Sequence, residues 1–278
     1  MTNMPTPEQL TPRIKEHLLK QAQRLFDSSV TSAGAVHQMR VASRRLRVGL
    51  CIFAELFEPR DLKQVQQHLR RVTRSLGPVR TLDVSLKLLR TAKASPVLQR
   101  TLARERQERL VEARGLLRLL AAAKFPDCVE DLIVGKARHR DERQLLRDAD
   151  VKLAERRRVL RKRLRRFSAR RNGAAFHKLR IAAKKYRYAL EAVQAVFAVD
   201  AAEPIAAVVR LQDLMGDCHD AEAALDWLRV HKKEFAVEAR GLIRYFQVEQ
   251  RRRFARVEKH LGGGCRWLRK VKLKLNHE

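Results

Sequence analysis

A basic helical segment occurs twice in this 278-residue chain. The first copy spans residues 36–47 and reads VHQMRVASRRLR; the second spans residues 176–187 and reads FHKLRIAAKKYR. Both copies have the same His, Arg, Ala and closing Arg, and an Arg-Arg pair in the first becomes Lys-Lys in the second. About thirty residues after each copy comes a second matching pair, RVTRSLG at 71–77 and RLQDLMG at 210–216. The paired matches predict a duplicated helical unit whose halves are related by a pseudo-twofold axis.

The remainder of the chain is also patterned as amphipathic helix. Apolar residues recur at helical spacing between capping and terminating residues, and 11 Gly and 8 Pro are too few for a turn-rich β protein. We find no segment typical of a strand, so we predict an all-α fold. The expected helices cover residues 6–27, 31–57, 61–76, a stretch after 83, 96–125, 141–167, 173–199, 203–215, 220–231 and 234–260.

Several of these boundaries depend on local signals. Gly77-Pro78 is a strong helix terminator, and residues 128–137 form only a weak helical pattern. We expect one domain over 1–278, built as two tandem helical bundles from repeats at about 8–125 and 139–262. Gly262 to Gly264 would form a hinge before a basic tail at 263–278.

The charge of the chain restricts its partners. Lys plus Arg total 61 against 31 Asp plus Glu, which gives a formal net charge of +30. Such a chain repels itself when compact unless a polyanion or counterions screen it, so nucleic acid, polyphosphate or an anionic membrane is the expected partner. The longest apolar stretch, 115–123, is interrupted by Arg118 and is too short to span a bilayer. We therefore expect no segment that spans a membrane, and a membrane is not among the predicted partners.

The sequence also indicates a compartment. Its four cysteines are widely separated, with no C-x-x-C, so neither a disulfide scaffold nor a zinc finger is expected and a reducing cytosol fits best. The first ten residues have no basic segment followed by an apolar one, which argues against a signal peptide. We predict a cytoplasmic protein. Nothing in the sequence specifies an oligomeric state.

Each repeated segment places its cations on one face of a helix. With His37 at 0°, Arg40, Arg44 and Arg47 lie at about 300°, 340° and 280°, an arc of about 80° covering about 15 Å of helix. The second copy places its basic residues the same way: His177, Arg180, Lys184 and Arg187. The opposite, apolar faces carry Met39, Leu46, Leu50 and Phe53 in one copy and Leu179, Tyr186, Leu190 and Val193 in the other.

Neighbouring like charges destabilise an isolated helix by tenths of a kcal/mol per pair, so an uninterrupted basic row requires another reason. Anion binding supplies one, because Arg offers planar forks to phosphate oxygens, Lys a point charge and His a directional donor. A single row would be read as a solvated helix face. Two corresponding rows favour function, and together they would line one basic channel for a linear anion.

The two repeated segments resemble the sequence pattern of a known family. The two H-x-x-R-[VI]-A-x-[RK]-[RK]-x-R stretches, with the L-G and M-G segments behind them, resemble the conserved histidine α-helical domain (CHAD) family over about residues 8–262. The resemblance implies two helical bundles about a basic central pore that binds inorganic polyphosphate. It assigns to that pore His37, Arg40, Arg44, Arg45 and Arg47 of the first motif, and His177, Arg180, Lys184, Lys185 and Arg187 of the second. Arg71, Arg80 and Arg210 are weaker assignments, and His219 departs from the family's Asn-Asp pattern.

Other constellations suggest no chemistry. The Asp217-Cys218-His219-Asp220 run is too tight for four ligands on one metal ion, and an N-cap before a helix at 220 would explain its acids. Gly135-Lys136 is not a phosphate loop, and there is no H-E-x-x-H or G-x-S-x-G. We therefore expect no metal site, no cofactor and no enzymatic activity.

Residues 156–171 contain ten basic residues in sixteen and no acid. They are equally consistent with a solvated helix, whose Arg stems cover Leu160, Leu164 and Phe167, and with a peripheral funnel that captures a polyanion. The sequence thus favours non-catalytic binding of polyphosphate, with targeting or scaffolding at polyphosphate granules. The competing hypothesis is a nucleic-acid-binding protein, supported by charge alone because aromatics are only 5%. The third hypothesis is an enzyme of polyphosphate metabolism. Against it, the sequence has no carboxylate cluster among the basic motifs that could bind a metal ion.

Overall fold

A computed structural model describes residues 10–26, 32–135, 141–197, 199–262 and 268. Over these residues the chain is helical and contains no strand, which confirms the all-α prediction. The elements are α1(Leu10–Phe26), α2(Ala33–Ile52), the 3₁₀ turn η2(Ala54–Leu56), α3(Pro59–Thr91), α4(Pro96–Ala122), α5(Phe125–Val134), α6(Glu142–Arg170), α7(Gly173–Phe197), α8(Ala202–Val230) and α9(Ala236–Gly262). The first residues of the helix expected at 6–27, the glycine hinge beyond residue 262 and nearly all of the basic tail lie outside the described residues.

The prediction that Gly77-Pro78 ends a helix is wrong. Helix α3 continues through both residues, with Pro78 in its interior. An interior proline costs about 3 kcal/mol in an isolated helix because it lacks an N–H and crowds the preceding turn. Here Leu76 and Val79, on either side of the pair, are fully buried and continue the apolar face of α3. Tertiary packing therefore outweighs the local signal.

Two further local predictions are also wrong. The helices expected at 203–215 and 220–231 are one helix, α8, because Met215, Cys218 and Ala221 continue a buried stripe across the expected break. The stretch at 128–137, which showed only a weak pattern, overlaps α5, in which Val129 and Ile133 pack into the core.

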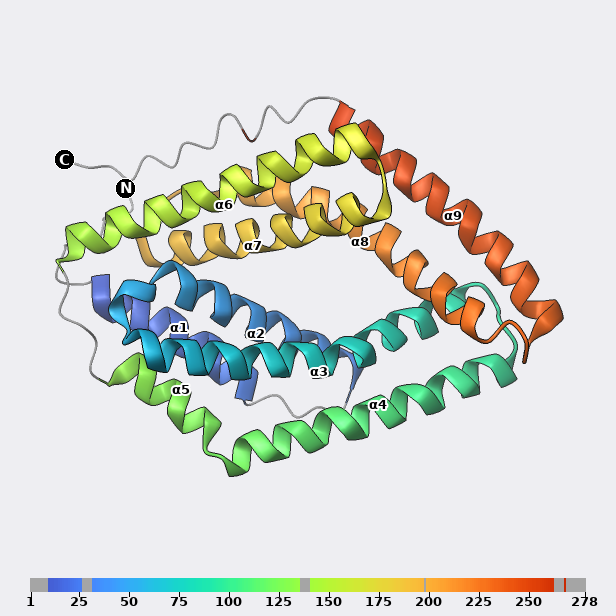
Figure 1. Cartoon of the computed structure of the whole chain (residues 1–278), viewed down its shortest axis with the longest axis horizontal. Helices are drawn as coiled ribbons and strands as arrows, with labels where there is room; N and C mark the ends of the chain where they lie inside the picture. Colours follow the sequence, from blue (N-terminus) through green and yellow to red (C-terminus); the bar gives the residue numbers. More distant parts are fainter. Residues whose placement is uncertain (1–9, 27–31, 136–140, 198, 263–267, 269–278) are drawn as a thin grey trace.

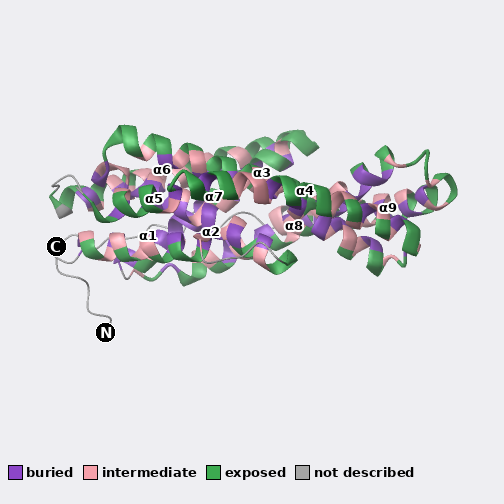
Figure 2. Cartoon of the chain, turned by 90° about the horizontal axis from the view of Figure 1, so that it is seen from below, coloured by how far each residue is buried: buried purple, intermediate pink, exposed green. Residues whose placement is uncertain are grey.

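The molecule is flat and elongated (Figures 1 and 2). Helices α2 and α7, which carry the repeated segments, contact each other; α2 also packs on α1 and α3, and α7 on α6 and α8. At the far end, the α3–α4 hairpin meets the α8–α9 hairpin (Figure 1). The two repeats are thus joined through α2 and α7. Their relation by a twofold axis, and the repeat boundaries, stay predictions.

Two apolar cores hold this arrangement, and each contains residues from both repeats. The larger core includes Leu46 of α2 and Leu179 of α7, and all eight residues predicted for the apolar faces of the repeated segments are buried. The smaller core lies at the far end and includes Leu89 and Leu98 against Leu225 and Phe246. Throughout the part of the chain that the structure describes, no helix has both the length and the apolar content needed to cross a membrane.

Candidate functional site

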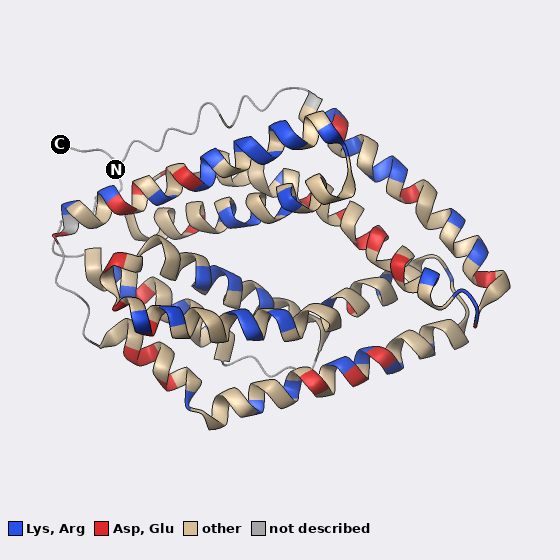
Figure 3. Cartoon of the chain, viewed as in Figure 1, with Lys and Arg blue, Asp and Glu red and all other residues tan. Residues whose placement is uncertain are grey.

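Basic residues of α2, α3, α7 and α8 act on one another where the two repeated segments pack together. Figure 3 shows the Lys and Arg positions along α2, α3 and α7. The pKa of Lys184 of α7 shows that these residues lie close together. Burial, followed by the charges of Arg180, Arg44 and Arg40, lowers that pKa to about 7. Burial, followed by the charges of Arg44, Arg80 and Arg180, lowers the pKa of Arg40 to about 10. We call this group the central cluster; it comprises His37, Arg40, Arg44, Arg80, His177, Arg180, Lys184 and His219.

Arg40 is held in place by α3. Its Nη1 donates a hydrogen bond of 3.0 Å to the carbonyl oxygen of Thr73. A Cβ atom at Gly77 would lie 3.2 Å from the same Nη1, so the glycine permits the guanidinium to cross the helix closely. Gly77 therefore marks a close approach of Arg40 to α3 and not a helix end, whereas a Cβ atom at Gly216 of the second repeat would meet nothing within 4 Å.

The histidines of the central cluster form two local groups. His37 lies near Arg80, and partial burial together with the charges of Arg80 and Lys184 lowers its pKa. The rings of His177 and His219 have centroids 6.2 Å apart, and burial plus the charges of Arg180 and Lys184 lowers the pKa of His219 to about 4. His219 therefore occupies in the second repeat the place of Arg80 in the first. The sequence contained this signal, because each residue stands three positions after its glycine.

A second group of cations adjoins the central cluster. Burial, then Arg70, Arg44 and Arg74, lowers the pKa of Arg47. Burial, then Arg156 and Arg47, lowers that of Lys185. We call this group the outer cluster; it comprises Arg47, Arg70, Arg74, Arg156 and Lys185. Sequence reasoning missed Arg70 and Arg74 and placed Arg156 only in the basic run 156–171, since only packing of α3 and α6 beside the repeated segments brings them here.

Arg45 and Arg187 are positioned differently from the other motif cations. Both bind the carboxylate of Glu191, through Nε–O distances of 2.9 and 2.6 Å, and both lie over the ring of Tyr188. Burial, followed by the charge of Arg45, lowers the pKa of His17 of α1. Arg45 therefore links α2 to α7, whereas Arg187 pairs with Glu191 within α7 and donates a hydrogen bond to Gln212 of α8.

The weaker sequence assignments separate into two groups. Arg80 belongs to the central cluster, because its charge acts on His37, Arg40 and Asp220. Arg71 and Arg210 are exposed on α3 and α8, and neither is among the main charges acting on a central-cluster residue.

The acids of α8 serve neither as a helix cap nor as part of a four-ligand group. Asp220 lies inside α8, so the predicted N-cap role is wrong. Burial raises the pKa of Asp220, while the nearby charges of Arg180, Arg80 and Lys184 oppose that rise. Among the described residues, no group of three or more His, Cys, Asp and Glu side chains is arranged to hold a metal ion.

Two guanidinium N–H groups of the clusters have no internal acceptor. The Nε atoms of Arg47 and Arg180 are buried and make no hydrogen bond within the described part of the chain. A buried unpaired donor costs roughly 1–3 kcal/mol, more when charged, so an acceptor brought by a ligand would be favoured here. Chemically, the clusters offer donors and positive charge to an anion with several oxygen acceptors.

Two observations bear on the basic run of α6, and neither tests whether it captures a polyanion. Leu160, Leu164 and Phe167 are buried, as the solvated-helix interpretation requires. The outer side of the helix borders a hollow of about 1040 Å³. Its basic lining residues are Arg157, Arg158, Arg161, Lys162, Arg165 and Arg166.

Comparison with known proteins decides the family. The CHAD domain pattern matches residues 13–229, which is most of the chain and includes both repeated segments. The chain belongs to the CHAD family. A CHAD domain from the plant Ricinus communis has a similar fold, with a TM-score of 0.68 and 19% identity over 95% of this chain and 93% of that one. PptA from Streptomyces chartreusis is similar with a TM-score of 0.61 and 16% identity, over 93% of this chain and 99% of that one. A comparison with curated protein sequences found no match.

Because the pKa of Lys184 is lowered, we expect anion binding to this CHAD domain to depend on pH. A bound polyanion favours the protonated amine, so binding raises a pKa that is about 7 in the free protein. Affinity should be greatest below pH 7 and fall by up to about tenfold per pH unit above it, because each binding event then takes up a proton. Lys184→Arg should flatten the decline between pH 7.5 and 9, because Arg stays charged. Fluorescence anisotropy with labelled long-chain polyphosphate measures this, and an unchanged slope in the variant would contradict it.

Proposed function

We propose that this protein binds inorganic polyphosphate without chemical turnover, through the central and outer clusters. Membership in the CHAD family supports a polyphosphate-related role. The observation that carries the proposal is the meeting of Arg40 and Arg44 of α2 with Arg180 and Lys184 of α7, at the cost of the pKa shifts described above. These partly buried cations repel one another and Asp220 offsets only part of their charge, so a linear polyanion would supply the remaining counter-charge along the whole row.

The chemistry of the clusters suits binding better than catalysis. Their members are donors and cations that would hold bridging and terminal phosphates alike, so they would not favour the transition state of one bond over its ground state. We therefore propose a targeting or scaffolding role at cytoplasmic polyphosphate granules.

Binding should weaken steeply with salt. If the five Arg and Lys side chains of the central cluster each neutralise one phosphate, log K should fall against log salt with a slope of about −3.5, taking about 0.7 per phosphate for a flexible single strand. Isothermal titration with long-chain polyphosphate in a salt series measures the slope. A flat response would contradict a multi-phosphate site.

Polyphosphate recovered after incubation of the protein with Mg²⁺ should retain its chain length. Progressive shortening of the chain would contradict the non-catalytic role.

Nucleic acid is the second candidate, and the basic hollow beside α6 is the observation that favours it. Recognition of single strands relies on exposed aromatic rings for base stacking. Tyr245 of α9, 47% exposed, is the one aromatic residue among the large, well-exposed apolar side chains that the described ranges contain. Competition at moderate salt distinguishes the two: polyphosphate should displace DNA at equal phosphate concentration, and the reverse would favour nucleic acid.

A further inference from the structure

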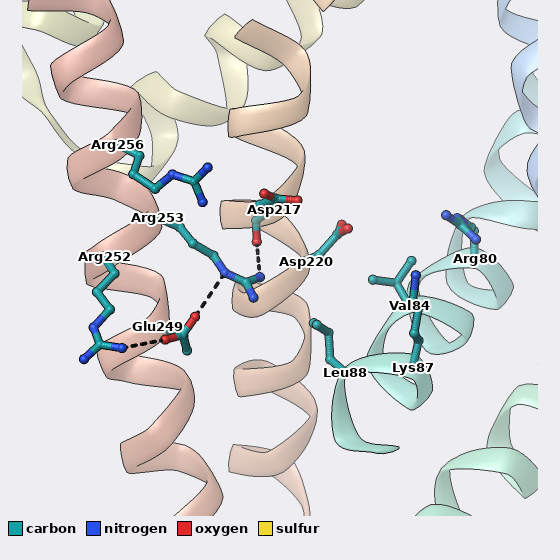
Figure 4. Close-up of a pocket in the computed structure, with 10 residues that line it drawn as sticks. All are labelled: Arg80, Val84, Lys87, Leu88, Asp217, Asp220, Glu249, Arg252, Arg253 and Arg256. Carbon is teal, nitrogen blue, oxygen red and sulfur yellow. Dashed lines mark hydrogen bonds and ion pairs between the residues drawn. The ribbon is translucent and has the colours of Figure 1, made fainter. Parts of the chain in front are cut away.

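A second charged pocket lies between α3, α8 and α9, beside the central cluster (Figure 4). Its volume is about 430 Å³. Its charged lining consists of Arg80 and Lys87 of α3, Asp217 and Asp220 of α8, and Glu249, Arg252, Arg253 and Arg256 of α9. Cations outnumber acids in this lining, and most of them come from α9, a helix that contributes nothing to the central cluster.

The acids of the pocket are partly neutralised within it. Glu249 pairs with Arg252 at 3.2 Å and with Arg253 at 3.6 Å, and Arg253 also donates to the carbonyl oxygen of Asp217 at 2.9 Å (Figure 4). Lys87 and Arg256, by contrast, form no ion pair within the described ranges of the chain. Both are exposed on facing walls of the pocket, so their charges are available to an anion.

The pocket is continuous with the central cluster. Arg80 lines the pocket and also acts on His37 and Arg40, and Asp220 lines it and also acts on Arg180. On the side away from the pocket, the outer cluster adjoins the central cluster through Arg47, on which Arg44 acts. Along α3 alone, from residue 70 to residue 87, the three groups extend over about 25 Å.

We propose that this pocket is a second phosphate subsite, which binds the part of a long polyphosphate chain that extends past the central cluster. The inference rests on the proposed function and adds a ligand preference to it. A long chain reaches from the outer cluster through the central cluster into the pocket, where Lys87 and Arg256 contact its oxygens. Tripolyphosphate is short enough to bind to the central cluster alone. The protein therefore selects long chains over short ones.

Reversing the two available cations tests the subsite. In the double variant Lys87→Glu/Arg256→Glu, affinity for long-chain polyphosphate should fall about tenfold, because two charge-assisted contacts become repulsive. Affinity for tripolyphosphate should change less than about twofold, because such a short anion contacts only nearby charges. The matched control is Arg60→Glu/Arg244→Glu, which makes the same charge change at exposed residues of the same two helices. Along the helices, these residues lie about 40 and 18 Å from Lys87 and Arg256.

Isothermal titration of the wild type and both variants with each ligand gives the result, after circular dichroism has shown equal helicity. A selective loss for long chains in the pocket variant alone supports the subsite. An equal loss for both ligands, an equal loss in the control, or no loss at all would overturn it. Failure of the proposed function is separate, since in that case the wild type itself would bind neither ligand.

Discussion

Charge reversal at Arg40, Arg44, Arg180 and Lys184 should reduce the affinity for long-chain polyphosphate at least about a hundredfold, because close contacts with phosphate become repulsive in a partly buried site. The four residues come from α2 and α7 and act on one another. Replacing them by Glu lowers the formal net charge from +30 to +22. Isothermal titration at fixed salt measures the loss.

The basic face of α6 provides the matched control. Replacing Arg158, Arg161, Arg165 and Arg166 by Glu changes the net charge equally, and all four side chains are exposed. This variant should bind about threefold more weakly, mainly through slower association, because it alters only the long-range field. Circular dichroism must first show that both variants are helical. Equal losses in two folded variants would refute the central cluster as the site.

Saturating polyphosphate should raise the melting temperature by roughly 10 °C. Without a ligand, holding mutually repelling cations together in a partly buried site lowers the free energy of unfolding. The lowered pKa values of Arg40, Arg180 and Lys184 indicate this repulsion. A ligand at a thousand times its Kd adds about 4 kcal/mol to the free energy of unfolding, and each kcal/mol raises the melting temperature by about 2–4 °C in a chain of this size.

Differential scanning fluorimetry with and without long-chain polyphosphate measures this shift. The variant with Glu at the four central-cluster positions should show almost none of it. Sodium sulfate at equal ionic strength serves as the second control, and a shift of similar size with sulfate would show general screening of the +30 charge instead of a specific site.

Much of the site could be predicted because helical periodicity is a local property. The spacing of His37, Arg40 and Arg44 places them on one face wherever the helix lies, and the same holds for Arg180 and Lys184. The opposite faces are buried as the spacing requires. The duplication itself indicated that both rows belong to one site, and the structure brings them together where α2 contacts α7.

Local signals were insufficient where long-range packing competes with them. Gly77-Pro78 has the composition of a helix end, yet α3 continues through it because its flanking residues are buried on both sides. The glycine instead provides space for Arg40, a residue 37 positions earlier in the chain. No local rule contains that contact, since its partner is set by how α2 crosses α3.

By itself, the sequence determined the all-α class, the duplicated basic rows and the family, and it led us to expect an anionic partner, since these follow from composition and from spacing along single helices. Only the tertiary structure decided which cations act together. It turned Arg45 and Arg187 toward Glu191, added Arg70, Arg74 and Arg156 from neighbouring helices, and placed the arginines of α9 beside the central cluster. The physical reason is that the environment of a charged side chain depends on which helices pack against its own, and that is fixed by the shared apolar cores.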